Sequence, residues 1–407
     1  MAIYLDHAAT TPMTPAAIAA YTAALTVVGN PASIHSQGQN AKRILEEARE
    51  QLAGSVGADA VEVTFTSGGT EAINLAIKGL YWNRASNRST ETAVGAGVGA
   101  TARNGRRPQL PRARILATRA EHHATIDSLE WLEAHEGAVI DWIPVDALGR
   151  IDIEYLAAAL SDEVALVTTL WANNEVGTIQ PISEIVALAS AHGVPVHADA
   201  VSTFGYLPID FHASGLAALS LSAHKIGGPV GVGAIVVSRL STLEPLAHGG
   251  NQQRFRSGTQ DAAGASAFGV VAARASHDVA DHAARLGALR DRLVTGVVAA
   301  VPSAVLRGDS EPGGRLPGNA HFTFAGCEGD SLLFLLDAVG FSVSTGSACQ
   351  AGVPEASHVL LAMGLSEPDA RGAIRMTLGH STTEAEVDAF VAALPAAVDR
   401  ARAAGLA

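Results

Sequence analysis

One lysine, one aspartate and one cysteine stand in sequence contexts that suit chemistry. Lys225 follows a strand-like run in Leu221-Ser222-Ala223-His224-Lys225, and Asp199 ends an earlier strand-like run 26 residues before it. A pyridoxal phosphate enzyme needs an amine for a Schiff base and an acid that pairs with the pyridine nitrogen. Cys349, in the Gly- and Ser-rich run Ser344-Thr345-Gly346-Ser347-Ala348-Cys349, adds a candidate sulfur nucleophile. Together the three residues predict chemistry on the sulfur of an amino acid.

A glycine-rich turn between a predicted strand and a predicted helix is a candidate phosphate site. In Ser67-Gly68-Gly69-Thr70-Glu71 the glycines allow close backbone approach, and the N–H groups of a helix N-terminus attract anions. The same Gly-Gly pair is equally compatible with a simple turn. Lys225 continues into Ile226-Gly227-Gly228-Pro229, a run without other charge, which is unusual for a surface lysine.

Other polar residues follow predicted strands, and the residues alone leave their roles open. In Glu121-His122-His123 either histidine can stack on a planar ring or transfer protons, or serve structure alone. The amides of Asn173-Asn174 can hydrogen-bond a ring oxygen or a substrate carboxylate. Arg256 and Arg375 are candidates for gripping a carboxylate, although each is equally compatible with a salt bridge.

The composition excludes several classes of protein. The net charge of −13 argues against direct nucleic-acid binding, which calls for a basic surface. Two cysteines, Cys327 and Cys349, cannot form a disulfide framework for 407 residues, so we expect a reducing compartment. No apolar run reaches membrane-spanning length and no signal peptide is recognised, which predicts a cytoplasmic protein. Cys327 follows a β-like run, and we expect a structural role for it.

Short β-rich runs alternate with longer amphipathic runs, which predicts an α/β fold with a mainly parallel sheet covered by helices. The expected strands are Val61–Thr66, Arg114–Thr118, Val164–Leu170, Val194–Asp199, Ala217–Leu221 and Gly233–Val237. The expected helices include Gln37–Val56, Gly69–Trp82, Ile182–His192 and Val279–Val298. The length favours two domains, with an α+β character after about Asp261.

Residues 84–114 have a composition unlike the rest of the chain. They hold seven arginines against one acid, Glu91, in a Gly-, Ala-, Thr- and Ser-rich context. This predicts a flexible basic loop inserted between a helix and a strand. A tolerated insertion is the simpler interpretation, and an arm that docks an acidic partner is the alternative.

The motifs together resemble the cysteine desulfurases of the NifS/IscS type, in the class V aminotransferase group of fold-type I pyridoxal phosphate enzymes. The resemblance covers nearly the whole chain, and its motifs occur in the family's order. They are Tyr4-Leu5-Asp6-His7-Ala8-Ala9-Thr10, Gly29-Asn30-Pro31-Ala32-Ser33-Ile34-His35, Phe65–Ala72, Asn173–Thr178, Ser222-Ala223-His224-Lys225, Arg256-Ser257-Gly258-Thr259 and Ser344–Cys349.

The resemblance implies a role for each candidate residue. It implies that Lys225 forms the Schiff base, that Asp199 pairs with the pyridine nitrogen, and that His122 stacks on the ring. It implies a persulfide on Cys349, with the other contacts made by Asn174 (ring oxygen), Arg375 (substrate carboxylate), Gly69, Thr70, Ser222 and His224 (phosphate), and Thr259 (phosphate, from the second subunit of a homodimer).

Three features depart from the family pattern. Ser202 stands where a glutamine is common, three residues after Asp199, and has a shorter reach toward the ring oxygen. The stretch His248–Arg256 is one residue shorter than usual and has Gln253 where a glutamate is usual, which affects contacts near Thr259. The insertion at 84–114 is absent from typical relatives.

The resemblance implies a homodimer. Its large domain (15–260) would hold a mainly parallel sheet of seven strands covered by helices, and its small α+β domain (1–14 and 261–407) would carry the cysteine loop. The resemblance also implies removal of sulfur from L-cysteine to give L-alanine, with persulfide transfer to acceptors in iron–sulfur cluster assembly or tRNA thiolation. A selenocysteine lyase or another class V enzyme is the first alternative, and a non-catalytic scaffold is the second.

Overall fold

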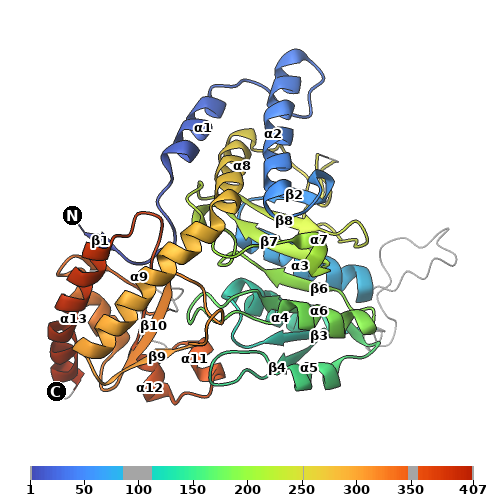
Figure 1. Ribbon diagram of the computed structural model, residues 1–407. Helices are drawn as coiled ribbons and strands as arrows, with labels where there is room; N and C mark the ends of the chain where they lie inside the picture. Colours follow the sequence, from blue (N-terminus) through green and yellow to red (C-terminus); the bar gives the residue numbers. More distant parts are fainter. Residues whose placement is uncertain (1, 86–111, 251, 347–355, 406–407) are drawn as a thin grey trace.

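The computed structural model describes residues 2–85, 112–250, 252–346 and 356–405 (Figure 1). Its main feature is a seven-stranded sheet in the order β2-β8-β7-β6-β5-β3-β4. These strands are β2 (Val63–Thr66), β3 (Arg114–Thr118), β4 (Val139–Ile143), β5 (Val164–Leu170), β6 (Val196–Asp199), β7 (Ala218–Ser222) and β8 (Gly233–Val237). β8 runs in the direction opposite to the other six strands of this sheet. The predicted mainly parallel sheet of seven strands is therefore confirmed.

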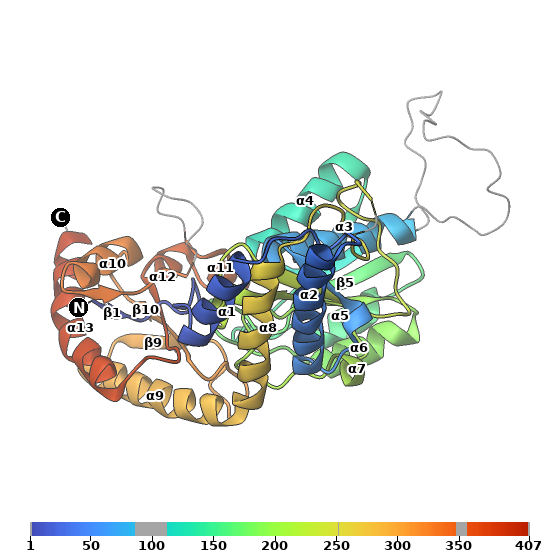
Figure 2. The ribbon, with the colours of Figure 1, turned by 90° about the horizontal axis from the view of Figure 1, so that it is seen from above.

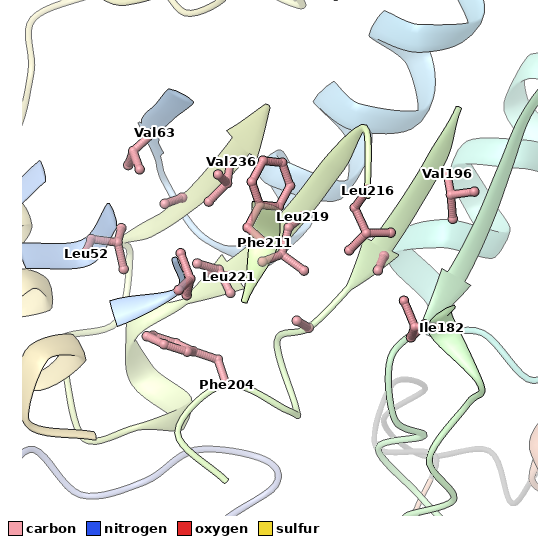
Figure 3. Packing of buried hydrophobic residues seen from close by; sticks show 14 of the residues in the cluster. Leu52, Val63, Ile182, Val196, Phe204, Phe211, Leu216, Leu219, Leu221 and Val236 are labelled. Carbon is pink, nitrogen blue, oxygen red and sulfur yellow. The ribbon is translucent and has the colours of Figure 1, made fainter. Parts of the chain in front are cut away.

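Alternate residues of the central strands bury on opposite faces of this sheet, as strand geometry requires. Leu219 and Leu221 of β7 and Val236 of β8 join one core cluster, where Figure 3 shows them near Phe204 and Phe211. Their neighbours along the strands pack into a different cluster on the other face. The first cluster is covered by α1 (Pro15–Leu25), α2 (Ser36–Ser55), α5 (Ile153–Ala159), α6 (Ile182–Ala191), α7 (Phe211–Ser214) and α8 (Ala262–His277), and the second by α3 (Gly69–Ala85) and α4 (His123–Glu136).

The predicted elements match closely, with small differences at their ends. The strands at 114–118, 164–170 and 233–237 agree to the residue. The first strand begins at Val63 rather than Val61, because Ala60–Glu62 form a 3₁₀ turn closed by a capping box between Asp59 and Glu62. β4 was not predicted, since its run Val139–Ile143 contains Asp141 and lies at the sheet edge with mixed burial.

A second core forms around a three-stranded antiparallel sheet in the order β12-β10-β9. The strands are β9 (Ala304–Arg307), β10 (Asn319–Phe324) and β12 (Ala373–Thr377), packed by α9 (Val279–Ala300), α10 (Gly329–Asp337) and α13 (Glu384–Gly405). The short helices α11 (His358–Ala362) and α12 (Glu367–Arg371) precede β12 in the chain. Near the N-terminus, β1 (Ile3–Tyr4) pairs in parallel with β11 (Phe341–Ser342), and Figure 2 shows β1 beside α13 at this core.

Helix α8 packs on α1 and α2, whereas α9 packs on α13. The two helices follow each other directly, at Asp278. The division of the chain into two domains near residue 261 stays a prediction.

Most of the arginine-rich insertion, residues 86–111, lies outside the described residues. Of its flanks, Arg84 stands in the last turn of α3, and Arg114 begins β3, where it bonds Asp141 and Ser161. In the described ranges no helix is both long and apolar enough to cross a membrane.

Candidate active site

The candidate residues follow the strands whose carboxyl ends share one edge of the large sheet. Asp199 ends β6, Ser222 ends β7, and a 3₁₀ turn over Ala223–Lys225 carries Lys225 past the same edge. Gly69 follows β2, and His122 follows β3. In open α/β sheets this edge is where ligands bind.

A cavity of about 280 Å³ collects these side chains. All predicted site residues within the described ranges line it, with the exception of Thr259. The lining residues among them are Gly69, Thr70, His122, Asn174, Asp199, Ser202, Ser222, His224, Lys225 and Arg375. Thr259 is exposed and does not line this cavity. Cys349 lies outside the described residues, while Gly346 before it and His358 after it line the cavity.

The turn that carries Lys225 is bound to the N-terminal segment of the chain. Lys225 Nζ donates to the backbone carbonyl of Ala8 and, at 2.8 Å, to that of Ala9. The backbone N–H of Thr11 donates to the carbonyl of His224 at 2.9 Å. Ala8 and Ala9 also line the cavity. The N-terminal segment therefore positions the Lys225 amine. The sequence identified the motif Tyr4–Thr10 in this segment but did not indicate this contact.

Asp199 is a buried carboxyl group at the end of its strand. Its Oδ1 accepts from the N–H of Val201 at 2.9 Å, and its residue is 3% exposed. Burial raises the pKa of Asp199 to about 6, although the Val201 N–H and the charge on Lys225 oppose this shift. A carboxylate in such surroundings is stabilised by a cation, which a protonated pyridine nitrogen supplies.

Glu121 is a second acid near this edge that sequence reasoning did not single out. Its Oε1 accepts from the Thr118 hydroxyl at 2.9 Å, and burial, with a smaller contribution from Asp199, raises the pKa of Glu121 to about 8. The only signal in the sequence was its position directly before His122.

His122 caps helix α4. Its Nδ1 accepts from the N–H of Ala124 at 3.0 Å, which places the ring proton on Nε2. Burial, followed by the charges of Lys225, His123 and His358, lowers the pKa of His122 to about 4. A neutral flat ring on the cavity wall suits stacking against an aromatic cofactor.

The turn at Gly68 and Gly69 requires residues without side chains. Gly68 has φ +152°, and a Cβ on Gly69 would lie 2.8 Å from Val201 Cγ2. Helix α3 begins there, and the buried hydroxyl of Ser222 lacks a hydrogen-bond partner within the described part. Free N–H groups and an unsatisfied hydroxyl fit a phosphate.

Arg375 is held at the cavity by two acceptors. Its Nη2 donates to Asp6 Oδ1 at 2.8 Å and its Nη1 to the carbonyl of Asn174 at 3.1 Å. Its Nε is buried and has no partner among the described groups. Asp6 was missed as a functional residue, although it stands in the motif that begins at Tyr4.

Glu175 lies close to the chain on both sides of residues 347–355. This residue is 1% exposed and accepts a hydrogen bond from the Ser357 hydroxyl. A Cβ on Gly346, at φ +96°, would lie 2.8 Å from Glu175 Oε2. Cys327, by contrast, packs in the second core, where burial raises its pKa, in agreement with its expected structural role.

The unsatisfied buried atoms test whether pyridoxal phosphate fits. Ser222 Oγ, Asn174 Oδ1 and Arg375 Nε all belong to residues that line the cavity. The Ser222 hydroxyl can donate to a phosphate and Arg375 Nε to a substrate carboxylate, while the Asn174 side chain is an amide whose NH₂ group can donate to a phenolic oxygen. With Asp199 and Lys225 in the same cavity, the residues present fit this cofactor.

Comparisons with known proteins agree with this geometry. The family model for the aminotransferase class-V family matches residues 3–96 and 92–390. The chain is 51% identical to an IscS-like cysteine desulfurase of Mycobacterium tuberculosis, over 99% of this chain and 98% of that protein. A solved NifS-like protein superposes with a TM-score of 0.86 at 30% identity, covering 98% of this chain and 100% of its own. SspA in complex with cysteine superposes with a TM-score of 0.75 at 28% identity, covering 93% and 99%.

Proposed function

Because the chain belongs to the aminotransferase class-V family, a family that uses pyridoxal phosphate, we propose that it is a cysteine desulfurase. The observation that carries the proposal is the meeting of Lys225 and Asp199 in one cavity, at the carboxyl edge of the sheet. Similarity to cysteine desulfurases over nearly the full length supports the substrate, and one structural neighbour is described with cysteine bound.

When bound, pyridoxal phosphate supplies an electron sink that makes the proton on the substrate's α-carbon removable. Asp199 pairs with the pyridine nitrogen, and Ser222, Thr70, His224 and the start of α3 hold the phosphate. Arg375 binds the substrate carboxylate, which fixes the α-carbon. The Lys225 amine takes the α-proton and later returns a proton to carbon.

The sulfur step belongs to Cys349 in this proposal. Its thiolate sulfur forms a bond to the substrate sulfur while the carbon–sulfur bond breaks, and the bonding electrons pass to carbon. Protonation of that carbon gives alanine, and Cys349 keeps a persulfide. Ser357, after this segment, donates to Glu175, and Gly346, before it, lies close to the same carboxyl group, which lines the cavity.

The assay that tests the proposal measures alanine and sulfide released from L-cysteine with a reductant, beside a Cys349→Ser variant. Equal amounts of alanine and sulfide from the wild type, lost in a variant that still binds cofactor, support it. A wild type that binds cofactor but releases neither product would exclude cysteine as substrate without an activating partner. Release of selenide from selenocysteine by Cys349→Ser would favour the selenocysteine lyase alternative.

The homodimer, the cytoplasmic location and the persulfide acceptors in iron–sulfur assembly or tRNA thiolation are part of the same proposal. Mixing Lys225→Ala and Thr259→Ala subunits tests the dimer and the crossing residue together. If Thr259 serves the partner's site, the mixed dimer contains one site with all its residues and regains activity that the Thr259→Ala homodimer lacks. Full activity of the Thr259→Ala homodimer would place Thr259 outside the site, and a defect that mixing does not rescue would contradict the contact across the dimer.

A further inference from the structure

A small second cavity adjoins the active-site cavity at Lys225. Its volume is about 30 Å³, and it shares Ala8, Asn174, Ser202 and Lys225 with the larger cavity. The rest of its wall comes from His7, Tyr206, Leu316, Gly318, Asn319, Thr377 and Leu378. Since a buried water needs roughly 10–15 Å³, this space is large enough for one.

Three polar atoms on this wall are unsatisfied. His7 Nε2, Asn174 Oδ1 and Asn319 Oδ1 are buried and have no hydrogen-bond partner in the described ranges of the chain. Native proteins satisfy nearly all buried polar atoms, and ordered water commonly does so where two to four polar groups converge. One water can donate to His7 Nε2 and to one of the two amide oxygens at a time, so the cavity suits a bound water that faces His7.

His7 is fixed and neutral in this position. Its residue is 2% exposed, and its Nδ1 lies 3.3 Å from Thr11 Oγ1. Gly379 packs so closely that a Cβ there would lie 2.0 Å from His7 Nδ1, which leaves the ring little freedom. Burial, followed by the charges of His380, His282 and Arg285, lowers the pKa of His7 to about 4 and outweighs the nearby Tyr4 carbonyl. A neutral imidazole has one donor and one acceptor nitrogen, which suits passing a proton onward.

On its other side His7 contacts Thr11, which lines a cleft of about 360 Å³. This cleft is lined by Thr11, Tyr206, His282 and His380 among others, and it shares none of its lining residues with the active-site cavity. The rings of His7 and His380 lie 6.3 Å apart. Tyr206 lines both the cleft and the small cavity, and its hydroxyl donates to the Lys225 carbonyl at 3.1 Å.

We propose that His7 and a water molecule in the small cavity form a proton-exchange path that joins Lys225 to this cleft. The path lets the lysine amine exchange its protons with solvent while substrate fills the larger cavity. The inference rests on the proposed function, since it concerns the proton that Lys225 removes from the substrate.

The proton balance of the path is simple. Lys225 takes the α-proton of the substrate and becomes an ammonium group, which releases a proton to the cavity water. The water passes a proton to His7 Nε2, and His7 releases one from Nδ1 toward Thr11 and the cleft. The reverse transfers return a solvent proton to Lys225, so no net charge or atom is gained.

The test follows deuterium from the substrate. L-Cysteine deuterated at the α-carbon is converted in ordinary water, and mass spectrometry measures the deuterium retained in the alanine. The wild type is expected to lose nearly all of the label. His7→Leu closes the path and is expected to raise retention several-fold, and His7→Gln, which keeps a polar atom but cannot relay a proton, to raise it as well.

Control variants distinguish loss of the proton path from a general effect of substitution on folding. His192→Leu, at the exposed end of α6, is expected to match the wild type. Thr11→Val, which removes the hydroxyl next to His7 Nδ1, provides a second path variant should both His7 variants fail to fold. Unchanged retention in the path variants, or high retention in the wild type, overturns the proposal. Absence of any alanine from the wild type instead overturns the proposed function. A crystal structure of the holoenzyme gives an independent readout: a water within about 3 Å of His7 Nε2 supports the path, and a dry cavity refutes it.

Discussion

Arg375 in β12 donates a hydrogen bond to Asp6, 369 residues earlier in the chain, at 2.8 Å. The Arg375 side chain is 3% exposed and the Asp6 side chain 18% exposed. Asp6 therefore sets the direction in which the guanidinium faces the cavity.

Removal of this partner is expected to weaken substrate binding. Asp6→Ala loses a charge-assisted hydrogen bond worth about 1.5–3 kcal/mol, so the KM for cysteine is expected to rise at least about tenfold. Asp6→Asn keeps an acceptor oxygen and is expected to show a smaller rise. Steady-state kinetics on both variants measure the difference, and an unchanged KM in Asp6→Ala would contradict a positioning role.

A second prediction concerns Gly346, before the segment that carries Cys349. Gly346→Ala places a Cβ at φ +96° against Glu175 Oε2 and His321 Nε2, whereas Gly340→Ala has a similar φ of +92° with no neighbour within 4 Å. Both variants carry the backbone cost of about 1–2 kcal/mol, but only Gly346→Ala has to move its neighbours. We expect Gly346→Ala to keep cofactor binding but to produce alanine at least about tenfold more slowly. This fall corresponds to a rise of about 1.4 kcal/mol or more in the activation free energy. Equal activity in the two variants would show that the contact with Glu175 does not matter.

Glu121 gives a pH-dependent prediction. Because burial raises its pKa to about 8, the group favours the folded state while protonated, and this contribution is lost as pH rises from the ordinary glutamic acid value through 8. Glu121→Gln removes the titration. The melting temperature of Glu121→Gln relative to wild type is therefore expected to rise between pH 6 and pH 9, as differential scanning calorimetry of the cofactor-free proteins can measure. A difference that stays constant over this range would mean that Glu121 does not titrate there.

Gln253 gives a prediction for the shortened stretch at 248–256. Its side chain accepts from the N–H of Phe65 at 2.9 Å and donates to the Phe65 carbonyl at 3.1 Å, as a neighbouring strand would. β2 is the edge strand of the sheet, so this amide covers one of its open positions. A glutamate can accept but cannot donate, although Arg49, 3.3 Å from Oε1, offers it a partial partner.

We therefore expect Gln253→Glu to lower the free energy of unfolding by about 1 kcal/mol and Gln253→Ala by about 2 kcal/mol. Urea titration of the three proteins measures these values. A Gln253→Glu variant more stable than the wild type would show that the ion pair with Arg49 outweighs the lost donor.

The sequence predicted those parts of the site that local patterns determine. Strand ends at Asp199 and Ser222, and the turn after β2, follow from runs of apolar residues and the glycines behind them. The strand β4 was missed because its polar residues conceal an edge strand. Asp6, Glu175 and His358 act through partners more than a hundred residues away, and spacing along one chain does not reveal such contacts. Cys349 and Thr259 stay predictions, the first outside the described residues and the second outside the cavity of one chain.

The N-terminal segment has a consequence for how the enzyme is made. Ile3 pairs with Phe341, Asp6 binds Arg375, and the carbonyls of Ala8 and Ala9 hold Lys225. At about 5–20 residues per second, the ribosome makes Arg375 roughly 20–70 s after Asp6. During that interval the first residues wait without their partners, and the large sheet can form before the active site has its last wall. The site for the substrate carboxylate is therefore completed only when the chain is almost finished, whereas the described cavity residues proposed to hold the cofactor are all made by the time synthesis reaches Lys225.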